Sequence, residues 1–202
     1  TLQDGRAVFN GAIFKSEYDD KQESILIPVN LANVATVIRN AASMEMTGLE
    51  LELMYQVTEA WDLMVTYGYL EAEYKDYLAD LTGDGVITDN SGLIPRNTPE
   101  NTFGFTTSYT TKVGNGELKG RVSYRFRDEM NSDSSNNPLG DLDSIENVNA
   151  TINYSINNYS VTLWGRNLTD EREQRWATIG GLTSRGWWNE PQTLGITFSV
   201  SY

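Results

Sequence analysis

A loop rich in aspartate and glycine carries the most specific spacing of candidate metal ligands in the chain. Oxygen ligands stand at alternate positions there, and Gly85 permits the sharp turn that a calcium loop requires. The candidate Ca²⁺ ligands in the 80–91 loop are Asp80, Thr82, Asp84, Val86 (through its carbonyl group) and Asp89. Ser91 stands where a bidentate glutamate is usual, so Asp89 or a distant carboxylate would have to replace it. An Asp/Gly-rich turn in a solvated loop accounts for the same residues, and a bound ion would order the loop rather than catalyse.

A row of basic residues alternates along one predicted strand, and it is the clearest candidate for binding an anion. Its members are Lys119, Arg121, Arg125 and Arg127. Residues at alternate positions of a strand share a face, so the row can guide an anionic ligand. The same cations can instead form ion pairs that brace the protein, with Glu50, Glu52 and Asp62 of other strands as partners.

Three tryptophans lie in the last long connection of the chain: Trp176, Trp187 and Trp188. Indole rings stack on sugar rings and on aromatic chelators, which makes these residues candidates for ligand binding. They are also suited to the interface between membrane and water, so insertion into the outer leaflet is the alternative.

Composition excludes several classes of function. The chain of 202 residues has 15 Lys plus Arg against 28 Asp plus Glu, and therefore lacks the basic surface that nucleic acid requires. Because it has neither Cys nor His, it has no disulfide, thiolate metal site or imidazole base. We therefore expect no enzyme, and an outer-membrane hydrolase is the weakest interpretation. The chain begins at Thr1 without a signal sequence, and we interpret it as a processed or truncated piece.

Strands are predicted along most of the chain, because apolar and polar residues alternate. From residue 48 to 55 the leucines share one face of such a strand, and Glu50 and Glu52 lie on the other. A turn at 56–60 leads to a second strand that begins at Trp61, so the two strands form a hairpin. The same unit recurs twice downstream. The first strand, roughly 7–18, is clear, but its outward face is ambiguous.

Short and long connections alternate between the eight predicted strands. The short connections are 56–60, 113–116 and 156–158, and the long ones are about 20–43, 75–98, 128–145 and 168–192. No apolar run reaches the length of about 18 residues that a membrane helix needs, whereas strands of about 9 to 11 residues suffice in a barrel. The pattern predicts an all-β, transmembrane antiparallel β-barrel in the outer membrane of a Gram-negative bacterium, with short periplasmic turns and long extracellular loops.

Aromatic residues gather beside the short turns and at the C-terminus. They are Tyr55, Trp61, Tyr109, Tyr154, Tyr159 and Tyr202. Amphipathic rings prefer the level of the lipid headgroups, so this distribution predicts an interfacial girdle. A soluble sandwich with a core of aromatic side chains is the alternative, but it does not explain why every second connection is long.

Several segments, taken in order, resemble those of TonB-dependent outer-membrane receptors. The segment Asn167-Leu168-Thr169-Asp170-Glu171-Arg172 is followed by Glu190-Pro191-Gln192-Thr193-Leu194 and an aromatic terminus at Tyr202. Residues 42–52 and 67–76 are similar to that family as well. The resemblance covers essentially the whole chain. Two departures are Gln192, where the family often has Arg, and Tyr202, where Phe is usual.

The resemblance implies a barrel of about 22 strands with an N-terminal plug, of which residues 1–202 would be the last eight strands. The plug, the TonB box and the earlier strands would be absent. It further implies TonB-dependent uptake of a scarce ligand, such as a ferric siderophore or an oligosaccharide. A self-contained eight-stranded barrel with an adhesion or structural role is the alternative.

The same resemblance implies two macromolecular partners, and the acidic excess of the chain indicates a lipid partner if the loops face outward. TonB would act through the missing plug, and the barrel-assembly machinery would recognise the C-terminal strand. Lipopolysaccharide and other outer-membrane lipids would surround the barrel. Because lipopolysaccharide is anionic and bridged by divalent ions, loop carboxylates would share its cations rather than bind it directly.

Overall fold

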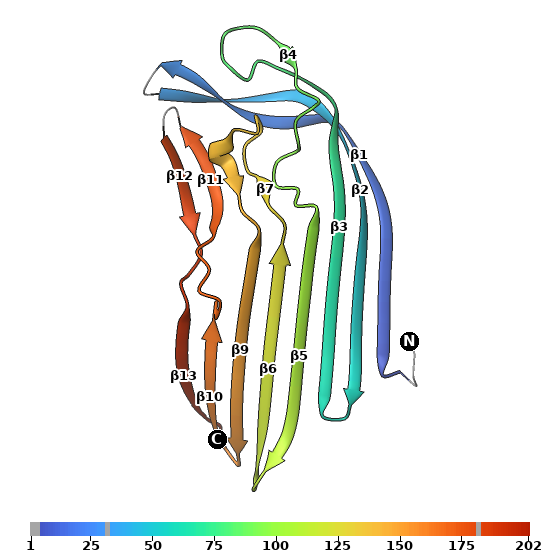
Figure 1. The fold of residues 1–202 in the computed structure, drawn as a ribbon, viewed down its shortest axis with the longest axis vertical. Coiled ribbons are helices and arrows are strands. Elements are labelled where there is room, and N and C mark those ends of the chain that lie inside the picture. Colours follow the sequence, from blue (N-terminus) through green and yellow to red (C-terminus); the bar gives the residue numbers. More distant parts are fainter. Residues whose placement is uncertain (1–4, 31–32, 181–182) are drawn as a thin grey trace.

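The computed structural model describes residues 5–30, 33–180 and 183–202, and it is almost entirely built from β-strands (Figure 1). The long strands are β1 (Ala7–Asn30), β2 (Asn33–Thr58), β3 (Trp61–Ala79), β5 (Asn101–Val113), β6 (Gly116–Arg127), β9 (Ile145–Ile156), β10 (Tyr159–Arg166) and β13 (Thr193–Val200). Shorter elements lie in the connections: β4 (Thr88–Asp89), β7 (Met130–Asn131), the 3₁₀-helix η1 (Pro138–Gly140), β8 (Asp141–Leu142), β11 (Gln174–Gly180) and β12 (Thr183–Trp188). Within the described residues, no helix is apolar and long enough to cross a membrane.

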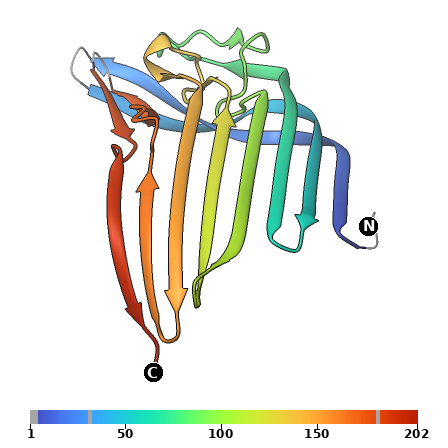
Figure 2. The ribbon, with the colours of Figure 1, turned by 60° about the horizontal axis from the view of Figure 1, so that its bottom comes forward.

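The eight long strands form one antiparallel sheet in the order β1-β2-β3-β5-β6-β9-β10-β13, which we call the wall. All short turns lie at one end of the wall and all long connections at the other, as Figures 1 and 2 show. We call these the turn end and the loop end. Gly114 and Asn157 have positive φ angles of 61° and 50°, which tight hairpin turns require. The predicted alternation of short and long connections is confirmed.

The wall is open in the part of the chain that the structure describes, because β1 and β13 are its two edges. A closed barrel would need hydrogen bonds between these edge strands. The alternative of a self-contained eight-stranded barrel is therefore not supported. The wall has instead the form of a curved section of a larger barrel (Figure 2).

Register separates the wall into an apolar and a polar face, because directly paired residues project to the same side. One continuous row of paired residues is Phe9, Leu53, Val65, Phe105, Tyr124 and Val148. The next row is Asn10, Glu52, Thr66, Gly104, Arg125 and Asn147. The predicted two-faced wall is confirmed. Register also settles the first strand, whose Phe9 and Ile13 lie on the apolar face, and Ile13 is 83% exposed.

Aromatic residues on the apolar face form a belt at the turn end, as predicted. Trp61 pairs directly with Tyr109, and Tyr159 begins β10 beside the last turn. Trp61 also donates a hydrogen bond of 2.7 Å from Nε1 to Thr107 Oγ1. The stretch of β3 from Trp61 to Tyr69 is about 26 Å long, close to the apolar band of about 25 Å of a membrane barrel before tilt is considered. The apolar face therefore has the height of a membrane-spanning surface.

Two predicted loops are in fact β-hairpins, and this corrects the expected boundaries. Residues 20–43 do not form a loop, because β1 and β2 have 24 and 26 residues and pair almost to their shared tip. Likewise the 168–192 connection contains the hairpin β11–β12. The expected strand length of about 9 to 11 residues holds only inside a membrane. Beyond it both faces meet water or other loops, so backbone pairing continues without an apolar alternation that the sequence could show.

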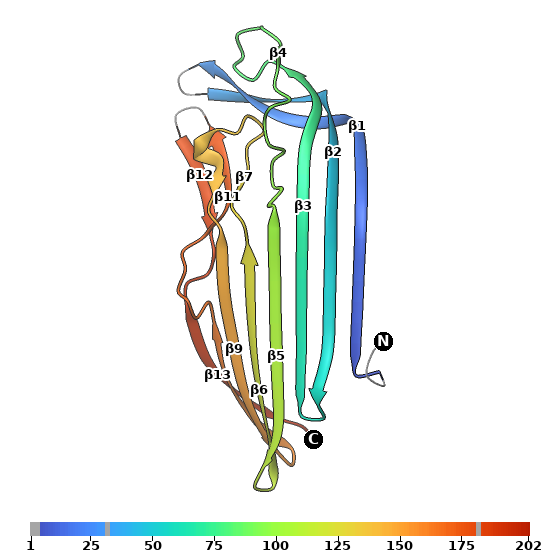
Figure 3. The ribbon, with the colours of Figure 1, turned by 45° about the vertical axis from the view of Figure 1, so that its right-hand side comes forward.

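The ribbon, residues 22–30 and 33–40, is the distal part of β1 and β2. It leaves the direction of the wall and crosses above the loop end toward β11 and β12 (Figures 1 and 3). A small buried core lies at its base, formed by Ile25, Ala42, Met44, Tyr74, Tyr77 and Ala79. The loop end is thus a packed structure and not a set of independent loops.

Candidate ligand-binding site

A cavity of about 780 Å³ opens on the polar face near the loop end of the wall. Polar-face residues from β3, β5, β6, β9 and β10 line it, and the chain between β12 and β13 covers one side. Its charged residues are Arg125, Arg127, Arg166, Glu173 and Glu190. The cavity therefore has an excess of positive charge, although the whole chain has a net charge of −13.

Arg127 ends β6 and is held by the backbone of the neighbouring connection. Its Nη2 donates to the carbonyl oxygen of Asp143 at 3.0 Å. Its Nη1 is buried and has no hydrogen-bond partner among the described residues. Arg125 precedes it on the same face, paired with Gly104 on one side and Asn147 on the other. The Thr66 hydroxyl fills the place that a Gly104 side chain would take, because a Cβ there would lie 2.4 Å from Thr66 Oγ1.

Arg166 is a site residue that the sequence analysis missed. It ends β10, and its guanidinium carbon lies 5.3 Å from the ring centre of Trp164, within the range of a cation–π contact. Trp164 in turn donates from Nε1 to Thr197 Oγ1 at 3.1 Å and lies across Gly195, where a Cβ would come within 2.2 Å of the ring. Alternation along β10 was the available signal, since it places Trp164 and Arg166 on the polar face.

The connection that covers the cavity is held by Asn167 and Asn189, which are both buried. Asn167 donates from Nδ2 to the carbonyl oxygens of Glu171 and Glu190, each at 3.0 Å. Asn189 donates from Nδ2 to the Glu171 carbonyl oxygen at 2.8 Å and accepts from the Glu173 amide at 3.1 Å. The segment that begins at Asn167 thus has a physical role, because it fixes the hairpin β11–β12 to the wall.

Trp187 and Trp188 of this hairpin lie on opposite faces of β12. Trp176 and Trp187 are direct cross-strand partners, whereas Trp188 pairs with Gln174 and lines the cavity. Trp187 and Trp188 are 72% and 62% exposed, and adjacent residues of a strand face opposite sides. The side chain of Trp176 lies outside the described residues. Of the predicted set, the cavity therefore brings together Arg125, Arg127 and Trp188.

Arg121 lies apart from that group, nearer the turn end, where it lines a smaller hollow with Asp62 and Ser108. Within the residues that the structure describes, no ion pair joins Arg121, Arg125 or Arg127 to Glu50, Glu52 or Asp62. The described ion pairs involve Lys15, Lys21, Lys75 and Arg96. Bracing of the polar face by ion pairs stays a prediction.

The 80–91 loop is folded around its own carboxylates. Asp80 accepts hydrogen bonds from the amides of Thr82, Gly83 and Gly85 at 3.1, 2.7 and 2.8 Å, and these bonds lower the pKa of its carboxyl group. Asp84 and Asp89 accept from the amides two residues ahead of each. Among the described residues no three acidic side chains are grouped as a metal site. Calcium binding by this loop stays a prediction.

The antiparallel wall with one apolar and one polar face defines a class of protein, namely β-barrels of the outer membrane. The sequence model of the family described as "TonB dependent receptor-like, beta-barrel" matches residues 1–168. The chain therefore belongs to this family, and the resemblance found in the sequence is confirmed. Receptors of this family reside in the outer membrane of Gram-negative bacteria, so the turn end is periplasmic and the loop end extracellular.

Solved structures of three receptors share the fold of this chain. The ferric yersiniabactin uptake receptor FyuA from Yersinia pestis has a TM-score of 0.79 at 16% identity, with 98% of this chain and 28% of the receptor covered. The ferric-catecholate import receptor Fiu from E. coli K12 has a TM-score of 0.71 at 20% identity, and the siderophore receptor PiuA from Acinetobacter baumannii has 0.70 at 21%. In both of these, 98% of this chain and 26% of the receptor are covered. The chain thus spans little more than a quarter of the receptors it matches.

Proposed function

We propose that the chain is the C-terminal barrel part of a receptor that takes up a ferric siderophore with energy supplied through TonB. The observation that carries this proposal is the cavity, where Arg125, Arg127 and Arg166 face the same space as Trp188. Family membership and the siderophore receptors among the matched structures support it. Contact with TonB would be made by a plug that these residues do not include.

The chemistry of the cavity suits an anionic chelate with flat rings. Guanidinium groups bind carboxylate and catecholate oxygens through paired hydrogen bonds, and Arg127 has a donor, Nη1, without a partner in the described structure. The exposed indole of Trp188 offers an apolar surface on which a ring can stack. An oligosaccharide is the second candidate, because the exposed indole surfaces of Trp187 and Trp188, although on opposite faces of β12, can each stack on a sugar ring.

Binding of a ferric catecholate to the full-length receptor tests this proposal. Arg125→Gln and Arg127→Gln should each weaken binding about tenfold or more, as expected for hydrogen bonds to a charged group. Lys119→Gln is the matched control, because Lys119 lies on the same face of β6 near the periplasmic turn. Trp188→Ala should weaken binding more than Trp187→Ala, which leaves the cavity intact.

Uptake of radioactive iron by cells that carry each variant gives the functional measurement. The proposal predicts that uptake falls with the two arginine variants and persists with Lys119→Gln. Unchanged catecholate binding and uptake in Arg125→Gln and Arg127→Gln would refute it. Growth on an oligosaccharide that depends on Trp187 and Trp188 would support the second candidate.

Lipid partners are proposed from a charged cluster on the outer surface, just above the apolar band. Lys15 Nζ lies 2.9 Å and Lys75 Nζ 3.7 Å from Glu45 Oε2. This cluster is at the level of phosphorylated headgroups in the outer leaflet, where ammonium groups meet phosphates and carboxylates share bridging cations. Retention of lipopolysaccharide by the purified receptor should fall in Lys15→Gln/Lys75→Gln. Insensitivity of that retention to a chelator would count against shared cations.

Recognition of the C-terminal strand by the barrel-assembly machinery is proposed from the family alone.

A further inference from the structure

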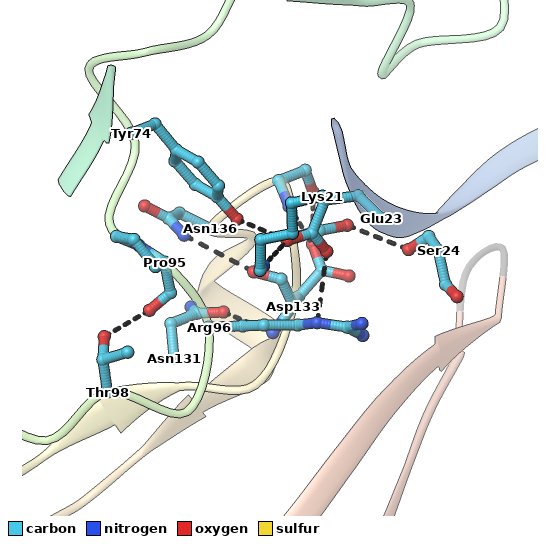
Figure 4. A network of polar contacts seen from close by, with 12 residues as sticks. Lys21, Glu23, Ser24, Tyr74, Pro95, Arg96, Thr98, Asn131, Asp133 and Asn136 are labelled. Atoms are coloured by element: carbon cyan, nitrogen blue, oxygen red, sulfur yellow. Dashed lines mark hydrogen bonds and ion pairs between the residues drawn. The ribbon is translucent and has the colours of Figure 1, made fainter. Parts of the chain in front are cut away.

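A fully buried carboxylate lies at the base of the ribbon. Glu23 of β1 is 0% exposed, and three side chains converge on it (Figure 4). The hydroxyl of Tyr74 donates to its Oε1 at 2.8 Å, Lys21 forms an ion pair with the same oxygen, and Arg96 Nε lies 3.3 Å from Oε2. Burial of a charge is costly unless it is paired, so these three partners stabilise Glu23 in this position. We call Glu23, Lys21, Tyr74 and Arg96 the latch.

The latch lies at a bend in β1, at the base of the ribbon. The pairing of β1 with β2 shifts between Tyr18 and Lys21 and again between Lys21 and Gln22. Asp20, inside this interval, has a φ of 53°. Bulges of this kind bend a strand and increase its twist. The bend therefore lies at residues 19–21, and it includes Lys21 of the latch.

The bend directs the ribbon toward the side of the cavity. Tyr74 pairs with Met44, and counting back along β3 in steps of two reaches Gly68, which pairs with Glu50 on the polar face. The latch therefore lies on that face, and the ribbon crosses above the extracellular end of the wall (Figures 1 and 3). The ribbon and the cavity thus lie on the same side of the wall, with the ribbon across its extracellular end.

Two other extracellular segments are tied to the same point. Ser134 donates from Oγ to the carbonyl oxygen of Ser24 at 3.0 Å. The segment that carries Arg96 is joined to that of Ser134, because the Ile94 amide donates to Asn136 Oδ1 at 2.7 Å. The base of the ribbon is thus joined to two other extracellular segments, those that carry Arg96 and Ser134, and these two segments are also joined to each other.

We propose that the ribbon is a hinged lid over the extracellular end of the receptor and that the latch holds it closed. The residues at the bend form the hinge. A buried ion pair stabilises a closed state only modestly, because hydration of the separated charges offsets much of the lost attraction. Opening therefore exposes Glu23, Lys21 and Arg96 to water at modest cost, which suits a lid that must open and close. The lid and its latch go beyond the proposed function and do not depend on which ligand passes beneath.

Hydrogen–deuterium exchange of the full-length receptor in lipid vesicles, without any ligand, tests this inference. Glu23→Gln keeps the size of the side chain but removes the charge that Lys21 and Arg96 share. Amides of Ser24, Ile25 and Val37 should then exchange on the order of tenfold faster. Glu45→Gln is the matched control, because Glu45 contacts one lysine on each neighbouring strand but lies on the outer surface. It should leave these amides unchanged.

Further variants keep the test decisive if Glu23→Gln fails to assemble. Tyr74→Phe removes one hydroxyl group and should accelerate the same amides, and Arg96→Gln should do so as well. Combined with Glu23→Gln, Arg96→Gln should add little, since the two residues share one contact. Amide exchange at wild-type rates in the Tyr74→Phe and Arg96→Gln receptors would refute the proposal that the latch holds the lid closed. Failure of siderophore binding would leave this result untouched, because no ligand is used.

Discussion

Replacement of Asn167 by alanine is expected to detach the β11–β12 hairpin from the wall. Asn167 is only 4% exposed, and its amide group bridges the beginning and the end of the connection. Its Oδ1 also accepts from the Glu171 amide and from Thr169 Oγ1, both at 3.2 Å. In addition its φ is 48°, a conformation that asparagine tolerates better than alanine.

The loss of stability in Asn167→Ala follows from these contacts. Loss of the two bonds from Nδ2 costs about 1 kcal/mol each, and the longer bonds to Oδ1 together contribute about as much as one of these. The positive φ adds about 1 kcal/mol for alanine. The free energy of local opening should therefore fall by about 4 kcal/mol. Since about 1.4 kcal/mol corresponds to a factor of ten, exchange in the connection should rise by on the order of several hundredfold.

Hydrogen–deuterium exchange on peptides from 186–192 of the full-length receptor measures this opening. Asn167→Gly separates the two causes, because glycine accepts the positive φ but lacks the amide, and it should recover only about 1 kcal/mol. Asn157→Ala is the matched control, since Asn157 has a φ of 50° in a periplasmic turn without a side-chain hydrogen bond among the described residues. Equal protection of 186–192 in wild type, Asn167→Ala and Asn167→Gly would refute the reasoning.

Four further predictions concern the wall and the extracellular end. Val65→Arg on the apolar face should lower the free energy of unfolding in bilayers by about 2–4 kcal/mol. Thr66→Arg on the polar face should lower it by less than about 1 kcal/mol. Similar losses in the two variants would contradict the assignment of faces. Burial raises the pKa of Tyr77 from 10.0 to about 12, so its contribution to stability is fully present below pH 10 and is lost as the pH rises from 10 to 12. Burial raises the pKa of Tyr74 as well, so absorbance of tyrosinate should show one late-ionising group fewer in Tyr77→Phe than in wild type. An unchanged titration would contradict this assignment. Hydrogen bonds from backbone amides lower the pKa of Asp80, so the 80–91 loop should lose protection against hydrogen exchange as the pH falls below 3.8. Asp80→Asn should weaken this pH dependence. If the loop binds Ca²⁺, added calcium should slow its exchange in wild type but not in Asp80→Asn/Asp84→Asn, and identical exchange with calcium and with chelator would exclude binding.

The alternation of residue types determined the wall and the orientation of its faces. Leu53 and Glu52 were assigned to opposite sides from their spacing alone, and the register confirms both. Trp61 and Tyr109 were placed in a belt at the turn end, and they are direct partners there. These features follow from the sequence because a strand between lipid and water imposes a period of two on every residue it contains.

Only the tertiary structure decided how the extracellular end is built and which residues meet at the cavity. Glu23 and Tyr74 are 51 positions apart, and the sequence around each gives no sign of the other. Similarly, spacing could not separate Trp188, which lines the cavity, from Trp187, or place Arg166 beside Arg127. Outside the membrane no single boundary sorts side chains by polarity. Contacts there depend on where distant segments meet in space, and a local period does not record that.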